Sequence, residues 1–155
     1  MDIKVINKKT IALLDHNEET ARLVYPSSFK TDANILLPNN DEYKIIPSGF
    51  FSSKMNIVHK GEVVGSITST MKGNIELSFN DEFKYTLKLT KWFKSEYVLY
   101  NDNKENIISV TPKFSWNNFS YNYALKIKST NVCPLLVLAC LYSVNYMIQL
   151  MSAIA

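Results

Sequence analysis

Residues 132–155 contain no charged side chain, and this stretch constrains the fold more than any other feature of the sequence. Asn131 and Pro134 are typical of a helix cap and first turn, so we expect a helix over 133–152. At about 1.5 Å per residue this helix would be about 30 Å long. That length matches either the hydrocarbon core of a membrane or the axis of a β-barrel.

Polar side chains on this helix favour a position inside a protein. At 100° per residue they fall within an arc of about 120°, and Ser143 lies outside it. Asn and Gln in a lone membrane span would lack hydrogen-bond partners, whereas a barrel interior can supply them. We therefore favour a core helix. The polar residues in the arc are Tyr142, Asn145, Tyr146, Gln149 and Ser152.

A tail anchor remains the alternative. In that hypothesis the protein is a membrane protein with a cytoplasmic β domain and a C-terminal span over 132–155. Lys126 and Lys128 would then form the positive cytoplasmic flank of the span.

From residue 2 to about residue 128 the sequence consists of short runs rich in Ile, Val, Tyr, Phe and Thr. Turn-like clusters separate them every eight to twelve residues, which is typical of antiparallel β-structure. Alternation over Phe83–Leu89 places Phe83, Tyr85, Leu87 and Leu89 on the core face, and Pro112 is expected at the end or edge of a strand. The expected strands cover 3–6, 10–15, 20–25, 34–37, 43–46, 55–59, 63–70, 75–79, 83–89, 96–101, 106–111 and 121–127.

A chain of 155 residues suits one domain with one core. About twelve strands with one apolar face need a partner to bury against, and the chain offers one hydrophobic helix. We therefore predict a mainly β fold over 1–155. It would be a single closed antiparallel β-barrel of about twelve strands enclosing the C-terminal helix.

The sequence offers no catalytic or cofactor motif, and it predicts neither an enzyme nor a cofactor. His16 and His59 are isolated from other ligand types, so no zinc site is expected. Cys133 and Cys140 would lie about 10 Å apart on the helix, which is too far for a disulfide. We interpret them as small buried residues of a protein in a reducing compartment. The charged N-terminal residues lack the apolar run of a signal peptide, so we expect a cytoplasmic protein.

The strand, short polar turn, strand units over Met55–Ile67 and Tyr97–Val110, followed by a hydrophobic C-terminal helix, carry a resemblance to a known fold. The chain resembles the tubby C-terminal-domain superfamily, which includes phospholipid scramblases and plant LURP-one-related proteins. The resemblance implies that the helix runs through the barrel. It also implies a binding or membrane-associated module rather than a catalyst, since tubby domains bind phosphoinositides through a basic pocket.

Lysine dominates the basic residues of the second half of the chain. Residues 83–155 contain eight Lys and three acidic residues, whereas residues 1–82 contain nine basic and eleven acidic residues. Lysine without arginine suits diffuse attraction to an anionic surface better than the reading of nucleic-acid bases. We predict a lipid-binding set of Lys84, Lys88, Lys126 and Lys128, with Trp92 and Phe93 as interfacial anchors.

Two hypotheses for these lysines stay open. In the first, they bind an anionic phospholipid or a protein partner and hold the protein peripherally at a membrane. In the second, they keep the strands soluble and prevent edge-to-edge pairing.

Overall fold

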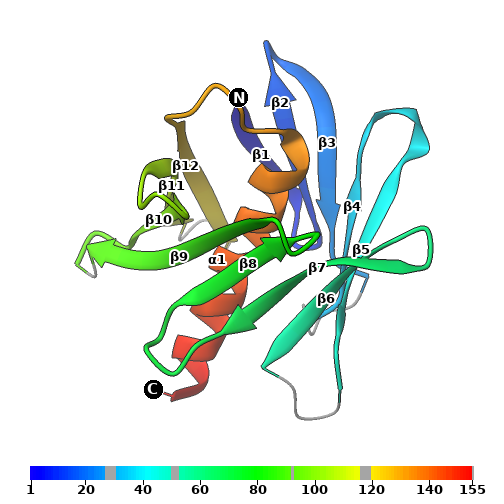
Figure 1. The fold of residues 1–155 in the computed structure, drawn as a ribbon. Helices are drawn as coiled ribbons and strands as arrows, with labels where there is room; N and C mark the ends of the chain where they lie inside the picture. The colour runs from blue at the N-terminus through cyan, green and yellow to red at the C-terminus, as the bar shows by residue number, and fades with distance from the viewer. Residues whose placement is uncertain (27–30, 50–52, 92, 116–119, 155) are drawn as a thin grey trace.

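In the part of the chain that the structure describes, twelve strands form one antiparallel sheet in which each strand pairs with the next along the chain. Figure 1 shows this meander wrapped around the C-terminal helix in the computed structural model, which describes residues 1–26, 31–49, 53–91, 93–115 and 120–154. The strands are β1 (Asp2–Asn7), β2 (Thr10–Asp15), β3 (Glu18–Val24), β4 (Ala33–Leu36), β5 (Glu42–Pro47), β6 (Lys54–His59), β7 (Glu62–Ser69), β8 (Ile75–Phe79), β9 (Phe83–Lys91), β10 (Glu96–Asn101), β11 (Asn106–Ser115) and β12 (Ser120–Ile127), with a short 3-10 helix, η1 (Pro38–Asn40), between β4 and β5.

The sheet curls into a nearly closed barrel, because β1 and β12, its two ends, lie beside each other. Alternation along the strands points one set of side chains inward. Ten consecutive strands each place one Leu or Ile in the interior with no exposed surface. These residues are Leu13, Leu23, Ile35, Ile45, Ile57, Ile67, Leu77, Leu87, Leu99 and Ile108.

The helix α1 (Pro134–Ile154) fills this interior and confirms the predicted fold class. Residues 136–147 are buried, and the helix contacts β3, β4, β8, β9 and β11. The segment Pro134–Ser152 of α1 is long and apolar enough to cross a membrane, but 67% of it is buried within the protein. An apolar surface on nearly every side of a helix is what burial in a barrel requires.

Two residues of the predicted polar arc of α1, Tyr142 and Asn145, form hydrogen bonds to groups outside the helix, whereas Ser152 bonds to the helix's own backbone. The Tyr142 hydroxyl donates to the backbone oxygen of Thr31 at 2.6 Å. Asn145 accepts a hydrogen bond from the Tyr123 hydroxyl and donates to the Tyr25 hydroxyl at 3.0 Å. Buried polar groups are costly without such bonds, so this network fixes how far α1 is rotated and inserted.

Alternate connections of the meander lie at opposite ends of the barrel. The β2–β3, β6–β7, β8–β9 and β10–β11 turns lie at the end where α1 begins. The β1–β2, β7–β8 and β9–β10 turns lie at the end where α1 finishes.

Two local predictions, for Phe83 and Cys133, are wrong, and the prediction for Pro112 is confirmed in one of its two forms. Phe83 is 55% exposed because it is the first residue of β9, beside the β8–β9 turn, where the core no longer covers it. Pro112 does not end β11 but lies at an edge, with Tyr123 of β12 as its pairing partner on one side and no partner in β10 on the other. Because pairing with β10 stops at Val110, the missing amide hydrogen of Pro112 breaks no pairing there.

The two cysteines also differ from each other. Cys140 is buried as predicted, but Cys133 precedes the first residue of α1 and is exposed.

Candidate functional site

Two of the four predicted lysines lie in one row across the outer wall. Lys88 of β9 pairs with Val98, Val98 pairs with Ser109, and Ser109 pairs with Lys126 of β12. Neighbouring strands lie about 4.8 Å apart. Three strand spacings separate β9 from β12, so the backbones of the two lysines lie about 14 Å apart. The structure thus brings Lys88 and Lys126 to the same outer face of β9–β12.

The other two lysines extend this wall along the barrel axis. Lys84 lies four residues before Lys88 on β9, about 13 Å away on the same face. Lys128 follows β12, and its amide donates to the backbone oxygen of Ile107 at 2.9 Å. All four side chains are exposed. We name the set Lys84, Lys88, Lys126 and Lys128 the lysine wall.

Carboxylates interrupt the lysine wall on one side. Glu76 of β8 pairs with Thr86, which lies between Lys84 and Lys88 on β9. Lys88 also places its Nζ 5.8 Å from the centre of the Tyr100 ring. A surface groove of about 800 Å³ follows this region, with both charge signs in its lining. Its charged residues are Lys72, Glu76, Lys88, Asp102 and Lys104.

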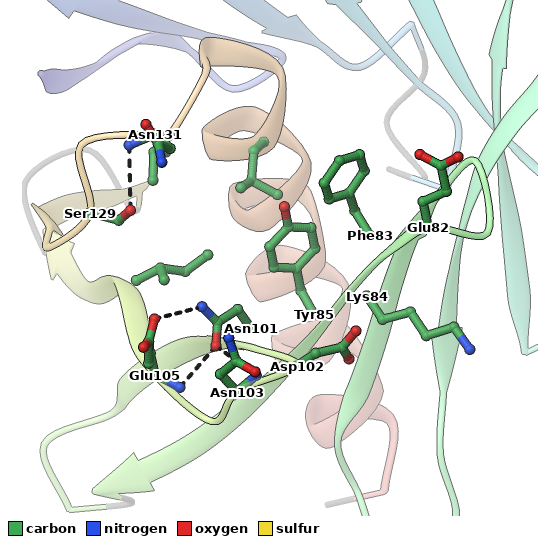
Figure 2. A pocket seen from close by; sticks show the side chains of 13 residues that line it. Glu82, Phe83, Lys84, Tyr85, Asn101, Asp102, Asn103, Glu105, Ser129 and Asn131 are labelled. Atoms are coloured by element: carbon green, nitrogen blue, oxygen red, sulfur yellow. Dashed lines mark hydrogen bonds between the residues drawn. The ribbon is translucent and has the colours of Figure 1, made fainter.

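The mouth of the barrel where α1 begins holds a smaller pocket of about 280 Å³. Figure 2 shows Phe83 and Tyr85 pointing toward α1, whereas the side chain of Lys84 points away from the pocket. Glu82, Asp102 and Glu105 contribute three carboxylates to the lining. These carboxylates would repel an anionic headgroup. This pocket is therefore not suited to the anionic lipid that the lysines are predicted to bind.

The polar groups of this mouth stabilise their own turn. The Asn101 side chain accepts from the amides of Asn103 and Glu105 at 3.0 Å each and donates to the Glu105 carboxylate at 2.9 Å. Such bonds are typical of Asn in tight turns. No group of three or more metal-ligating side chains was found among the described residues.

Sequence reasoning missed one paired histidine. His59 Nε2 lies 2.7 Å from Asp41 Oδ1, and the imidazole stacks on Tyr43 with ring centres 4.1 Å apart. Tyr43 and His59 are cross-strand partners in β5 and β6, which explains the stacking. The sequence places both residues on neighbouring strands, but the register that joins them comes from the sheet.

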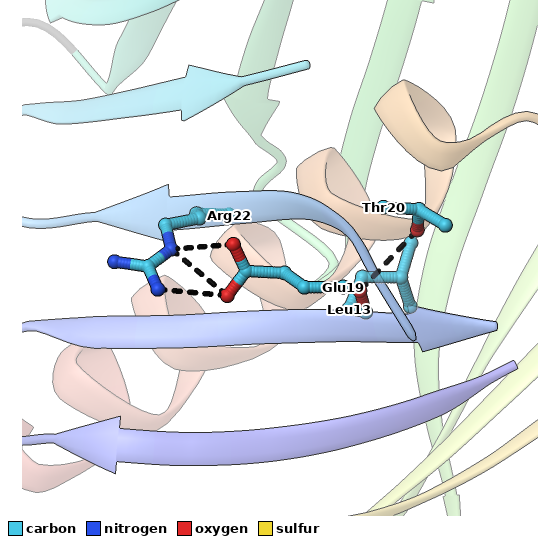
Figure 3. Close-up of polar contacts among 4 residues, drawn as sticks. All are labelled: Leu13, Glu19, Thr20 and Arg22. Carbon is cyan, nitrogen blue, oxygen red and sulfur yellow. Dashed lines mark hydrogen bonds and ion pairs between the residues drawn. The ribbon is translucent and has the colours of Figure 1, made fainter. Parts of the chain in front are cut away.

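Arg22, the one arginine in the chain, is engaged by Glu19. Figure 3 shows the two side chains meeting over β3, with nitrogen–oxygen distances of 2.8–2.9 Å. The register shifts between Leu13 and Leu14, and this irregularity brings residues three apart to one face. The hydrogen bonds from Arg22 lower the pKa of the Glu19 carboxyl. Arg22 is therefore matched by a local carboxylate.

Cys140 is a poor nucleophile in this structure. Complete burial raises the pKa of its thiol to about 12, so the thiol stays protonated at neutral pH. Of the predicted interfacial anchors, Phe93 is 69% exposed, whereas Trp92 lies outside the described residues.

Comparisons of the chain with protein-family models, with curated proteins and with solved structures found no match.

Proposed function

We propose that this protein is a non-enzymatic binding module that attaches peripherally to anionic phospholipid surfaces. The observation that carries the proposal is the shared outer face of Lys88 and Lys126, with Lys84 and Lys128 on the same wall. Lysines that project from a rigid sheet can approach a flat surface together. Near an anionic membrane each lysine contributes about 1 kcal/mol, so the wall contributes about 4 kcal/mol at low salt.

The chemistry of the interior is consistent with a binding role. The interior is filled by α1, and the pocket at the mouth carries carboxylates over a self-bonded turn. Cys140 is buried and protonated, and the His59–Asp41 pair is joined by a stacked tyrosine. These groups support stability and turn geometry, which leaves the exposed surface as the place for recognition.

The first prediction concerns vesicle flotation. Purified full-length protein should float with vesicles containing phosphatidylserine and stay unbound with neutral phosphatidylcholine vesicles. Lys88→Glu combined with Lys126→Glu should weaken binding about tenfold or more, because two attractions become two repulsions. Salt at 0.5 M, where the Debye length is about 4 Å, should release most of the bound protein.

The matched control is Lys44→Glu combined with Lys60→Glu. This pair changes the net charge of the protein by the same amount as the test pair, but on β5 and at the β6–β7 turn. Equal weakening by both pairs would show a net-charge effect and contradict a role for the wall. Failure to float with either vesicle would overturn lipid binding and direct the search to protein partners.

A further inference from the structure

Acidic residues gather at the end of the barrel where α1 begins, which we name the acidic end. Counting the turns and the three strand residues beside them, eleven of the fourteen Asp and Glu residues lie there, against the seven lysines Lys4, Lys44, Lys60, Lys84, Lys104, Lys126 and Lys128, a formal charge of −4. The eleven are Asp2, Asp15, Glu18, Glu19, Asp41, Glu42, Glu62, Asp81, Glu82, Asp102 and Glu105.

The opposite end, where α1 finishes, is basic, and we name it the basic end. Seven described lysines lie in its turns or at the strand ends beside them, against Asp32, Glu76 and Glu96, a formal charge of +4. Glu96 lies 3.9 Å from Lys91. The seven lysines are Lys8, Lys9, Lys54, Lys72, Lys91, Lys94 and Lys113.

Exposed apolar side chains concentrate at the same basic end. Met71, at the β7–β8 turn, is fully exposed, and Phe93, at the β9–β10 turn, is 69% exposed. Of the ten large hydrophobic residues exposed in the described part of the chain, six lie here. They are Ile6, Ile46, Met71, Phe93, Phe114 and Met151.

The last turns of α1 join this surface. Ile148 and Met151 line a shallow groove together with Tyr97 and Phe114, and Tyr97 donates a weak hydrogen bond to the Met151 sulfur at 4.0 Å. The apolar residues are therefore spread over the β-turns and the end of the helix, and lysines flank them. Lys94 lies over the Phe93 ring, with Nζ 6.0 Å from its centre.

This combination has the properties of a bilayer interface binder. Lysine stems lie along apolar surface while their ammonium groups reach phosphate oxygens. Met and Phe side chains gain free energy when they leave water for the acyl boundary. The opposite charge of the acidic end turns it away from an anionic surface, so the field of the whole barrel sets the orientation.

We propose that the basic end is the membrane-docking surface of this protein, with Met71 and Phe93 inserted into the interface of an anionic bilayer and the acidic end facing the solvent. This proposal rests on the proposed attachment to anionic phospholipid and adds the basic end to it: Lys88 borders this end, whereas Lys84, Lys126 and Lys128 of the lysine wall lie toward the acidic end. Lys88 lies three residues before Lys91 on β9, so Lys88 continues the basic surface along the side of the docked barrel.

The orientation can be read from two fluorescent labels. Cys133 is exposed at the acidic end and accepts an environment-sensitive dye directly, whereas Cys140 is buried. For the basic end, Met71→Cys is combined with Cys133→Ser and labelled with the same dye. On phosphatidylserine vesicles the dye at position 71 should shift to shorter wavelength, and the dye at position 133 should not.

A second experiment measures the contribution of the apolar residues. Met71→Ser combined with Phe93→Ser should weaken binding to the same vesicles about tenfold or more. Val63→Ser combined with Phe83→Ser is the matched control, because these residues are 61% and 55% exposed near the acidic end. The control pair should change binding less than twofold. Thermal unfolding of each variant shows whether the fold is retained.

The outcomes separate the two proposals. Binding with a spectral shift at position 133 but none at position 71 would overturn the basic end as the docking surface and leave lipid binding intact. Equal losses from the two serine pairs would do the same. Absence of binding to any vesicle would overturn both proposals together.

Discussion

Gly65 of β7 has no room for a side chain. A Cβ atom there would lie 2.4 Å from the backbone oxygen of Ser78 and 3.2–3.3 Å from side-chain atoms of Phe79 and Ile57. The register of β6 and β7 shifts beside it, between Ile57 and Val58. Gly65 therefore allows β6 and β8 to approach β7 closely at an irregular point of the barrel.

Gly65→Ala should lower the free energy of unfolding by about 2–4 kcal/mol, because the new methyl group meets backbone that cannot move alone. Urea unfolding followed by circular dichroism measures this change. Gly73→Ala is the control, since Gly73 has a positive φ but open space around it, and should cost about 1 kcal/mol. A smaller loss for Gly65→Ala than for Gly73→Ala would contradict the close approach.

Because the Cys140 thiol is buried, we expect the protein to lose stability at alkaline pH. Its thiol pKa is about 12 in the folded protein and about 9 when unfolded, so the unfolded state binds fewer protons between these values. Stability should therefore be fully present below about pH 9 and fall above it, by at most about 1.4 kcal/mol per pH unit. Burial also raises the pKa of Tyr25 and Tyr142, which adds to the loss at higher pH.

Urea unfolding at about pH 8 and pH 9.5 tests this before the tyrosines ionise. Cys140→Ala should flatten the decline, and Cys133→Ala should leave it unchanged because Cys133 is exposed. An unchanged slope in Cys140→Ala would show that other groups cause the decline.

At the scale of elements, α1 is the part of the chain on which the barrel depends. Its residues 136–147 are buried against strands that come from both halves of the sequence. The bonds from Asn145 to Tyr25 and Tyr123 tie the helix to β12 and to the end of β3. A tail anchor would leave the inner faces of those strands without a partner.

A chain ending at Thr130 distinguishes the two roles of α1. If the helix is the core, this chain should aggregate, bind a hydrophobic dye and lose cooperative unfolding, because the inner Leu and Ile residues are exposed. A tail-anchored protein would instead give a soluble fragment with a cooperative unfolding transition. Size-exclusion chromatography and urea unfolding of the fragment measure the difference.

At the scale of the whole molecule, the barrel converts a modest net charge into a strong axial asymmetry. The formal charge of the chain is +3, yet the two ends carry −4 and +4. Each meander turn contributes to one end only, so residues far apart in sequence add their charges at one place. Such a separation orients a protein near a charged surface without any specific contact.

Sequence patterns were sufficient for the architecture. The alternation over β9 and the uncharged stretch before the C-terminus predict strands, a helix and their mutual burial, because burial of apolar faces is decided by local periodicity. The polar arc containing Asn145 likewise predicts a helix with protein partners. Phe83 and Cys133 were misplaced because both lie at the ends of elements, where the periodic pattern stops and the surrounding loops decide exposure.

The functional surface depends on three-dimensional proximity. The sequence by itself separates a slightly acidic first half from a basic second half, and it selects Lys84, Lys88, Lys126 and Lys128. The strand registers join Lys88 to Lys126, and the antiparallel order collects Met71, Phe93 and their lysines at one end of the barrel. The sequence determined which side chains of a strand point toward the core, because that alternation is local to each strand, but it did not determine the exposure of Phe83 and Cys133. The tertiary structure alone decided which exposed residues are neighbours, since that depends on pairings between strands that no local pattern encodes.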